Sequence, residues 1–463
     1  MTFLTANSQS YQHGVAIRSF YLFLVCILLL YSRLTNLSFA QQVWRIEMPS
    51  SPNPVGSGAR ALGMGGAFIA IADDATAASW NPGGLVQLEE PEFSIVSAYT
   101  HRMHENEFGT NPEASGTQLV SYSRVNYLSA AYPFALFGRR MLISPNYQHL
   151  FDFTRKASFP LEQHTDTLSL FQNYESRMNG SLSAIGIAYC VQITPVFSFG
   201  VTLNLWEDGL YKNEWKEKSY QRGSGLLSSD DASYSFSFEI KSLSRYSFSG
   251  RNANFGILWD INKRLTMGIV LKTPFKADLI HTFRCNESLI FPDNPESNIE
   301  DSSDDTSKKK LDMPMSYGIG IAYRFSDNFT AALDIYRTEW SDFILTDSDG
   351  NKTSPISLKP PSESDINDTT QIRFGIEHLF IGPKYLIPVR YGIFYDPAPA
   401  VKQPDDYFGI SLGSGISIHP FIFDITYHYR FGNEVGRSML QALDFSQDLH
   451  EHTIYSSLII HFR

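Results

Sequence analysis

The stretch that decides the fold is MPMSYGIGIAYRF, residues 313–325. Every second side chain in it is large and mostly apolar, and the residues between them are small or polar. Strict alternation of this kind places the two sets on opposite faces of a β-strand. The stretch is longer than the five or six residues of an average soluble strand, and its length fits a tilted strand that crosses a bilayer.

The same alternation recurs in three further stretches, residues 196–205, 407–418 and 421–431. A soluble sandwich would bury the apolar face of such strands against a second sheet. An outer-membrane barrel would instead turn the apolar face to lipid and line its lumen with the small and polar face. The alternation alone leaves both architectures open.

The connections between the predicted strands favour the barrel. Short connections alternate with long ones, and the longest are residues 154–177, 208–245 and 284–311. Short turns on one rim and long loops on the other are typical of outer-membrane barrels, whose short turns face the periplasm. We therefore predict an all-β fold, a transmembrane antiparallel β-barrel of about 14 strands. The predicted strands are residues 92–104, 117–136, 139–153, 178–193, 196–207, 246–260, 264–283, 312–325, 328–345, 369–380, 387–397, 406–418, 421–431 and 452–463.

Aromatic residues near the predicted strand ends suit the interface between lipid and water, where one ring contacts both. The candidates are Tyr323, Tyr336, Trp340, Tyr427 and Tyr429. We expect a terminal aromatic residue in a barrel delivered to the barrel assembly machinery, and here Phe462 is penultimate. The predicted location is the cell outer membrane of a diderm bacterium.

The composition excludes several classes of protein. The chain has 463 residues, of which 43% are hydrophobic and 18% charged, and its net charge is −11. The apolar content is ample for a folded core, which argues against disorder, and three cysteines cannot build a disulfide scaffold. An acidic chain is a poor partner for nucleic acid, because phosphate binding needs a basic face.

The N-terminus carries the only long apolar run, residues 20–30, preceded by Arg18 and followed by the small-residue exit site Ser38, Phe39 and Ala40. This order is typical of a secretory signal peptide. We therefore predict a signal peptide over residues 1–40. The alternative is an N-terminal membrane anchor, because the leader is longer than most signal peptides.

Residues 41–91 do not show the strand pattern and are rich in glycine, alanine and proline. Within them, Asp73 and Asp74 precede a short alanine-rich stretch that Asn81, Pro82 and Gly83 end, which predicts a capped short helix. Small residues allow close packing against a barrel wall. We predict that residues 41–91 form a hatch, or plug, in the lumen of a barrel formed by residues 92–463.

This segment, GSGARALGMGGAFIAIADDATAASWNPGGL over residues 56–85, resembles the N-terminal signature of the FadL/TodX-like family. Members of that family are outer-membrane transporters of long-chain fatty acids and other hydrophobic compounds. The resemblance implies a hatch inside a barrel of about 14 strands, with Gly65, Gly66, Asn81, Pro82 and Gly83 as hatch residues. The family has Asn-Pro-Ala where this chain has Asn81, Pro82 and Gly83. Residues 314–343 and 388–399 are also similar to that family.

The resemblance further implies passive transport, in which a hydrophobic molecule leaves sideways through a gap beside a kink in the third strand. The third predicted strand contains Pro145, followed by Asn146. Proline cannot donate to the strand ladder and is found at edges or bulges, so the wall should be locally unpaired there. We predict a lateral gate at Pro145 and Asn146, faced by residues 81–83. The alternative is a bulge with no role in transport.

Four hatch side chains are candidates for contact with a hydrophobic ligand, namely Phe68, Ile71, Trp80 and Leu85. Packing of the hatch against the wall also requires apolar side chains, so the sequence does not separate the two roles. The expected partners are hydrophobic small molecules such as fatty acids, and also outer-membrane lipid and lipopolysaccharide. We expect a monomer.

Motifs for catalysis are weak. Residues 409–413 match G-x-S-x-G, but that motif works on a strand-to-helix turn and here lies within an alternating strand. The histidines show no metal-ligand spacing, so we predict no enzyme activity, no cofactor and no metal. Two other functions remain open. One is a partner barrel that binds exported proteins without transport, as in the type IX secretion shuttle proteins (PorV-like), and the other is an outer-membrane lipid hydrolase.

Overall fold

The computed structural model describes residues 55–228, 232–440 and 443–462. The predicted signal peptide lies outside these residues. The strands are β1 (Glu92–Phe108), β2 (Gly116–Leu136), β3 (Arg139–Asp152), β4 (Arg155–His164), β5 (Leu168–Thr194), β6 (Phe197–Trp206), β7 (Glu214–Ser228), β8 (Ser233–Asp260), β9 (Leu265–Lys272), β10 (Phe275–Ile290), β11 (Ile299–Met313), β12 (Ser316–Ser326), β13 (Phe329–Thr338), β14 (Ile344–Thr346), β15 (Lys352–Thr353), β16 (Thr369–Ile381), β17 (Leu386–Tyr395), β18 (Phe408–Ile418), β19 (Phe421–Val435) and β20 (Phe445–His461).

Helical structure in the described residues is confined to short pieces. Two α-helices, α2 (Ala59–Gly63) and α3 (Ala77–Trp80), and the 3-10 helix η3 (Pro82–Gln87) precede the first strand. The remaining 3-10 turns lie in connections and are η4 (Pro112–Ala114), η5 (Pro295–Ser297), η6 (Trp340–Asp342) and η7 (Pro361–Glu363). Among the helices described, we find none with the length and apolarity needed to span a membrane.

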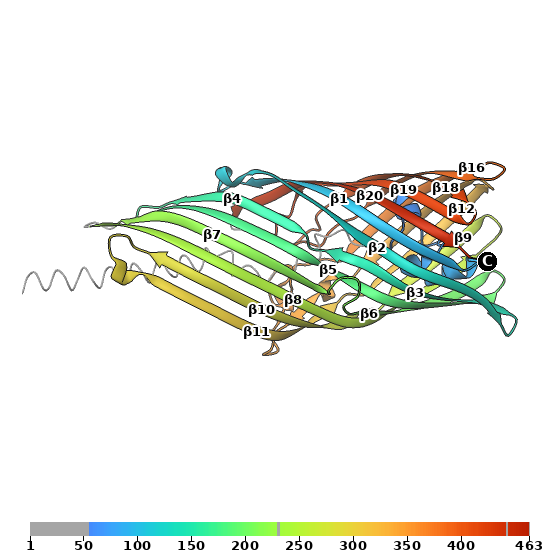
Figure 1. Ribbon diagram of the computed structural model, residues 1–463, viewed down its shortest axis with the longest axis horizontal. Helices are drawn as coiled ribbons and strands as arrows, with labels where there is room; N and C mark the ends of the chain where they lie inside the picture. Colours follow the sequence, from blue (N-terminus) through green and yellow to red (C-terminus); the bar gives the residue numbers. More distant parts are fainter. Residues whose placement is uncertain (1–54, 229–231, 441–442, 463) are drawn as a thin grey trace, which may run out of the picture.

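The strands form a closed antiparallel barrel (Figure 1). Closure comes from β1, which pairs with β2 on one side and with the last strand, β20, on the other. Several wall strands are divided into two consecutive segments that share the same neighbours, as β3 and β4 both pair with β5. Counted in this way, the wall has 14 strands, and the predicted fold class is confirmed.

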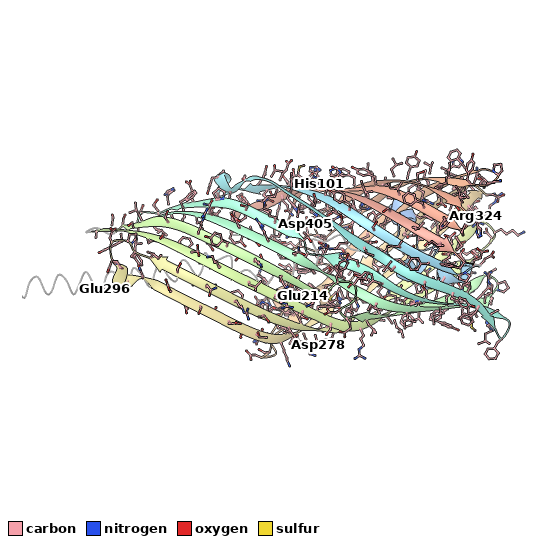
Figure 2. All side chains as sticks on the ribbon, in the orientation of Figure 1. His101, Glu214, Asp278, Glu296, Arg324 and Asp405 are labelled. Atoms are coloured by element: carbon pink, nitrogen blue, oxygen red, sulfur yellow. The ribbon has the colours of Figure 1, made fainter. Side chains whose placement is uncertain are left out.

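The two faces of the wall are those predicted from the alternation. Ile319 and Ile321 of β12 are 45% and 44% exposed on the outside, whereas Ala322 is buried towards the lumen. An exposed apolar face rules out the soluble sandwich, in which that face would be covered by a second sheet. Charged side chains lie at both ends of the barrel, as shown by Glu296 at one end and Arg324 at the other (Figure 2). This distribution fits a wall that contacts lipid between two aqueous ends.

The aromatic girdle was only partly predicted. Tyr323 and Tyr427 are exposed on the outer face, as expected. Tyr336 and Trp340 are buried inside the barrel, with 2% and 3% of their surface exposed, so their prediction as girdle residues was wrong. The reason for Tyr336 is strand parity, because its neighbour Ile335 takes the outward position in β13.

The long connections differ from the prediction. Much of residues 154–177, 208–245 and 284–311 consists of paired strands, which form the hairpins β4–β5, β7–β8 and β10–β11. These hairpins lengthen the wall at the end of the barrel that lies far from the C-terminus (Figure 1). Their sequences escaped prediction because the outer strand residues are polar on both faces, as in residues 300–308. A strand that no longer faces lipid does not need an apolar outer face.

The segment that precedes the barrel, residues 55–91, packs against the inner face of the wall, and we call it the N-terminal segment. The helix α2 contacts β17–β20, and η3 contacts β3, β5, β6 and β8. Glycines of the wall permit this backbone contact. A Cβ atom on Gly392 would lie 2.0 Å from Gly65 N, and one on Gly375 would lie 2.2 Å from Met64 O.

Candidate transport site

A chain of ion pairs ties the N-terminal segment to the wall. Arg60 of α2 donates to Asp73 at 2.5 Å and to both carboxylate oxygens of Glu377 on β16, at 3.0 and 2.9 Å. Glu377 also accepts from Arg390 at 2.6 Å, and Arg390 donates to Asp424 on β19 at 2.6 Å. Each buried charge in this series of ion pairs is therefore next to an opposite charge, as burial requires.

The predicted hatch glycines form the turn after α2. Gly65 and Gly66 have φ angles of 67° and 78°, a left-handed conformation that glycine adopts without a steric cost. Gly65 N donates to Ser411 Oγ at 2.8 Å, and Gly65 O accepts from Arg373 at 3.0 Å. Ser411 Oγ also donates to Gly63 O at 3.0 Å. Ser411, the serine of the G-x-S-x-G sequence, therefore lies on β18 and is hydrogen-bonded to the N-terminal segment.

Asn81, Pro82 and Gly83 lie against β5, β6 and β8. The Asn81 amide donates to Ile69 O and to Ile257 O of β8, at 2.8 and 2.9 Å, and its Oδ1 accepts from Gly83 N. Gly83 O accepts from Ser198 Oγ of β6 at 2.7 Å. Asn81 thus caps η3 and fixes it to the wall at once.

The ladder between β2 and β3 is interrupted at the predicted gate. Ser129 pairs with Asn146 and Tyr132 pairs with Ile143, but no pairing joins the residues between them, 130–131 of β2 and 144–145 of β3. On the other side of β3 the ladder with β5 runs through Pro145, which pairs with Ile187. The unpaired stretch is therefore confined to one seam of the wall, which we call the β2–β3 seam.

The N-terminal segment is hydrogen-bonded to β2 at this seam through Ala75, while η3, which contains Pro82 and Gly83, contacts β3. Tyr127 and Ser129 of β2 donate their hydroxyls to Ala75 O, at 3.0 and 3.2 Å. The side-chain hydrogen bonds that involve Asn81 and Gly83 join them to β5, β6, β8 and the segment itself. Ala75 is the part of the N-terminal segment bonded to the strand beside Pro145.

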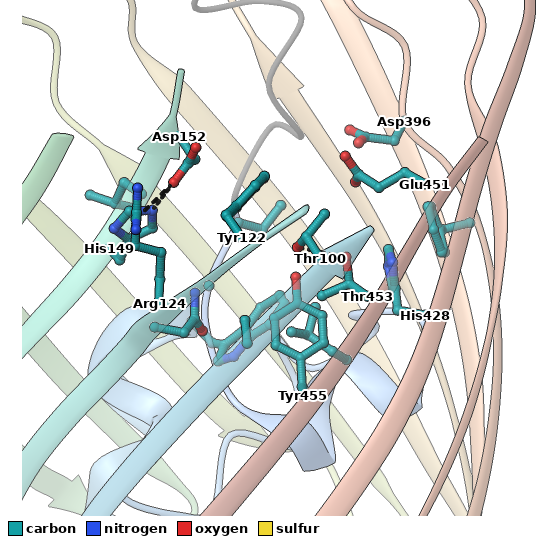
Figure 3. A pocket seen from close by; sticks show the side chains of 18 of the residues that line it. Thr100, Tyr122, Arg124, His149, Asp152, Asp396, His428, Glu451, Thr453 and Tyr455 are labelled. Atoms are coloured by element: carbon teal, nitrogen blue, oxygen red, sulfur yellow. Dashed lines mark hydrogen bonds and ion pairs between the residues drawn. The ribbon is translucent and has the colours of Figure 1, made fainter. Parts of the chain in front are cut away.

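Two cavities lie in the lumen next to the N-terminal segment. The first, the charged pocket, has a volume of about 100 Å³ and is lined by ionisable residues from several strands (Figure 3). They include Arg124, Asp152, Arg373, Asp396 and Glu451. His149 lies 3.4 Å from Asp152 in this pocket (Figure 3). Such a lining favours water and polar groups over an apolar molecule.

The second cavity, the aromatic pocket, has a volume of about 70 Å³ and a different lining. Its walls are aromatic and apolar side chains together with uncharged amides and hydroxyls, and its one charged residue is Lys272, whose ammonium donates to Val55 O at 2.7 Å. The aromatic and apolar lining residues are Leu150, Phe151, Trp206, Phe275, Met313, Pro314, Tyr336 and Trp340, and the uncharged polar ones are Gln148, Asn204, Asn252, Asn254, Thr273, Ser316 and Thr338. This combination is typical of sites for hydrophobic molecules.

The four predicted ligand residues are placed differently from one another. Trp80 lines the charged pocket, and its indole donates to Ser57 O at 2.6 Å. Phe68, Ile71 and Leu85 belong to the hydrophobic cluster that packs the N-terminal segment against the wall. They do not line either of the two cavities in the described part of the chain. Contact of the four with a ligand stays a prediction.

Sequence reasoning missed the aromatic pocket altogether. Its residues come from six of the 14 wall strands, and no local motif connects Asn204 of β6 with Trp340 after β13. The available signal was the parity of each strand, which places Tyr336 inside the barrel. Parity says which face a residue takes, but the register between strands is needed to show that these residues meet.

A family model described as "Outer membrane protein transport protein (OMPP1/FadL/TodX)" matches residues 54–441. The chain belongs to this family. It is an outer-membrane β-barrel of the family that transports hydrophobic compounds. Members of the OMPP1/FadL/TodX family are transport channels rather than enzymes.

Solved structures of family members share the fold. A Pseudomonas aeruginosa FadL homologue matches with a TM-score of 0.60 and 13% identity, over 89% of this chain and 100% of that chain. The Pseudomonas putida toluene transporter TodX matches with a TM-score of 0.54 and 13% identity, again over 89% and 100%. The Ralstonia pickettii toluene transporter TbuX gives a TM-score of 0.52 and 13% identity, over the same shares. The comparison with curated protein sequences gives no match.

Proposed function

We propose that this protein is a passive channel for hydrophobic molecules such as long-chain fatty acids, and that it releases them sideways through the β2–β3 seam. The observation that carries the proposal is the interrupted ladder beside Pro145. The aromatic pocket lies close to this seam along β3, because Gln148 and Leu150 line the pocket. A molecule in the pocket is thus separated from the seam by only a few residues of one strand.

The N-terminal segment explains why the route would be lateral. It is bonded to β16 and β18 through Arg60 and Ser411 and to β6 and β8 through Gly83 and Asn81, and we infer that it plugs the lumen towards the short turns. An apolar molecule that enters from the hairpin end therefore meets a plug. Exit into the surrounding bilayer avoids both the plug and the transfer of an apolar solute into water, which is unfavourable.

Uptake by cells tests this proposal. A deletion strain, the same strain with the gene restored, and the parent are given a labelled long-chain fatty acid or toluene, a compound that TodX is described as transporting. We expect uptake to fall in the deletion strain and to recover with the restored gene. Unchanged uptake together with the loss of a surface protein would favour the partner-barrel function. Unchanged uptake with altered outer-membrane lipid would favour the hydrolase.

A further inference from the structure

A row of uncharged polar side chains connects the aromatic pocket with the β2–β3 seam. Ser129 pairs with Asn146, Asn146 with Gly186, Gly186 with Asn204, and Asn204 with Asn252, so the row crosses β2, β3, β5, β6 and β8 in register. We call these residues the amide row. One end of the amide row adjoins the unpaired residues of the seam, and the other end lines the aromatic pocket.

Glycine at the centre of the amide row keeps it continuous. A Cβ atom on Gly186 would lie 2.6 Å from Asn146 Oδ1 and 3.0 Å from Asn204 Oδ1. The side-chain amides of Asn146 and Asn204, on the two strands that flank β5, therefore both extend to the space beside Gly186. Any side chain at this position would separate them.

Three buried polar atoms of the aromatic pocket have no hydrogen-bond partner among the described residues, namely Asn204 Oδ1, the Tyr336 hydroxyl oxygen and Trp340 Nε1. These three residues are 4%, 2% and 3% exposed. Asn252 and Asn254 are already engaged, because Trp206 Nε1 donates to Asn252 Oδ1 at 2.9 Å and Asn252 donates to Asn254 Oδ1 at 3.1 Å. The pocket thus offers a ligand one acceptor, Asn204 Oδ1, one donor, Trp340 Nε1, and the Tyr336 hydroxyl, which can donate or accept.

Leaving a buried polar atom unpaired is costly, so a ligand that pairs with it gains affinity over one that does not. A hydrocarbon pairs with none of these atoms. A carboxylate is an acceptor only and cannot donate to Asn204 Oδ1. A hydroxyl group both donates and accepts, and therefore matches both kinds of atom.

We propose that the aromatic pocket and the amide row select hydrophobic molecules that carry an uncharged hydroxyl group, such as long-chain alcohols or alkylphenols. The apolar body of the ligand lies among the aromatic side chains. As the ligand moves to the seam, its hydroxyl forms hydrogen bonds with one side chain of the amide row after another. This inference rests on the proposed function and names its substrate class. Neither charged groups nor an energy source take part in the step.

Equilibrium binding to the purified full-length barrel in amphipol tests the proposal. The probes are tritiated 1-dodecanol, dodecane and dodecanoate, measured by scintillation proximity with protein-free amphipol subtracted. We expect dodecanol to bind about tenfold more tightly than dodecane, a ratio that corresponds to one buried hydrogen bond. Asn204→Leu and Trp340→Phe should each lower the ratio, whereas the exposed Asn286→Leu should leave it unchanged.

The outcomes separate this proposal from the function on which it rests. Dodecane or dodecanoate binding as tightly as dodecanol would overturn the selection of hydroxyl compounds and leave the transport function standing. An unchanged ratio in Asn204→Leu would also overturn it. If none of the three ligands binds, both proposals fail. Heat-modifiable migration on gels confirms that each variant is folded before binding is measured.

Discussion

Arg60 and Glu377 are 317 residues apart in the chain and are joined by two hydrogen bonds, 3.0 Å from Nε and 2.9 Å from Nη2. The pair connects the N-terminal segment with wall strand β16. Glu377 is 5% exposed at its side chain and Arg60 is 20% exposed, so the pair is largely shielded from water. Hydrogen bonds to charged groups contribute about 1.5–3 kcal/mol, which makes this contact a principal anchor of the N-terminal segment.

Arg60→Ala should loosen the N-terminal segment. Glu377 keeps Arg390 as a partner, so the wall should still fold, but α2 loses its bonds to β16. We expect more frequent opening of a water-filled path, seen as a several-fold rise in single-channel conductance events in planar bilayers. Arg337→Ala is the control, because it removes a 2.8 Å pair with Asp368 that lies outside the N-terminal segment. Equal conductance in the two variants would show that Arg60 does not hold the plug.

Gly392→Val should disturb the contact between the wall and the N-terminal segment. A Cβ atom at this position overlaps Gly65 N, and overpacking of this kind costs about 1–3 kcal/mol. We expect the folded band on a cold gel to convert to the unfolded band at a lower temperature than in the unmodified protein. Gly116→Val is the matched control, because a Cβ atom there meets nothing within 4 Å. A similar loss in both variants would mean that strand propensity, rather than contact with the plug, sets the effect.

Pro145→Val should reduce uptake of the hydrophobic substrate. Valine restores a backbone donor in the unpaired stretch and favours strand conformation, so the β2–β3 seam gains ladder pairing. We expect initial uptake rates to fall several-fold, with the amount of barrel in the outer membrane unchanged. Pro388→Val provides a control, because Pro388 also lies where a ladder is interrupted, between β17 and β18 near a short turn. Unchanged uptake in Pro145→Val would leave Pro145 as a bulge without a role in transport.

The wall could be predicted from the sequence wherever it faces lipid. In residues 313–325 the alternation alone gives the strand and its outward face, because lipid selects an apolar residue at every second position. In β7, by contrast, Glu214, Lys216 and Lys218 do not face lipid, so no such selection acts and the pattern predicts a loop. Alternation of apolar and polar residues therefore does not predict the hairpins that extend beyond the membrane.

The site was harder to predict than the wall for a related reason. Pro145 could be found because proline interrupts a ladder wherever it lies in a strand. The acceptor at Asn204 and the donor at Trp340 carry no local signature, and they meet only through the register of β6, β8, β9, β12 and β13. Likewise, nothing local indicates that Ala75 rather than Asn81 is bonded to the strand at the seam.

A reversible cross-link across the β2–β3 seam tests the central claim most directly. Ala131→Cys and Ser144→Cys are combined in a Cys190→Ser background, since both positions lie in the unpaired stretch and Cys190 lies in the same hydrophobic cluster as Ala131. Uptake of the labelled substrate is then measured with the disulfide formed, as shown by mass spectrometry, and again after reduction. Lateral release predicts that uptake falls to the level of the deletion strain in the oxidised protein and recovers on reduction. Full uptake by the oxidised protein would contradict it.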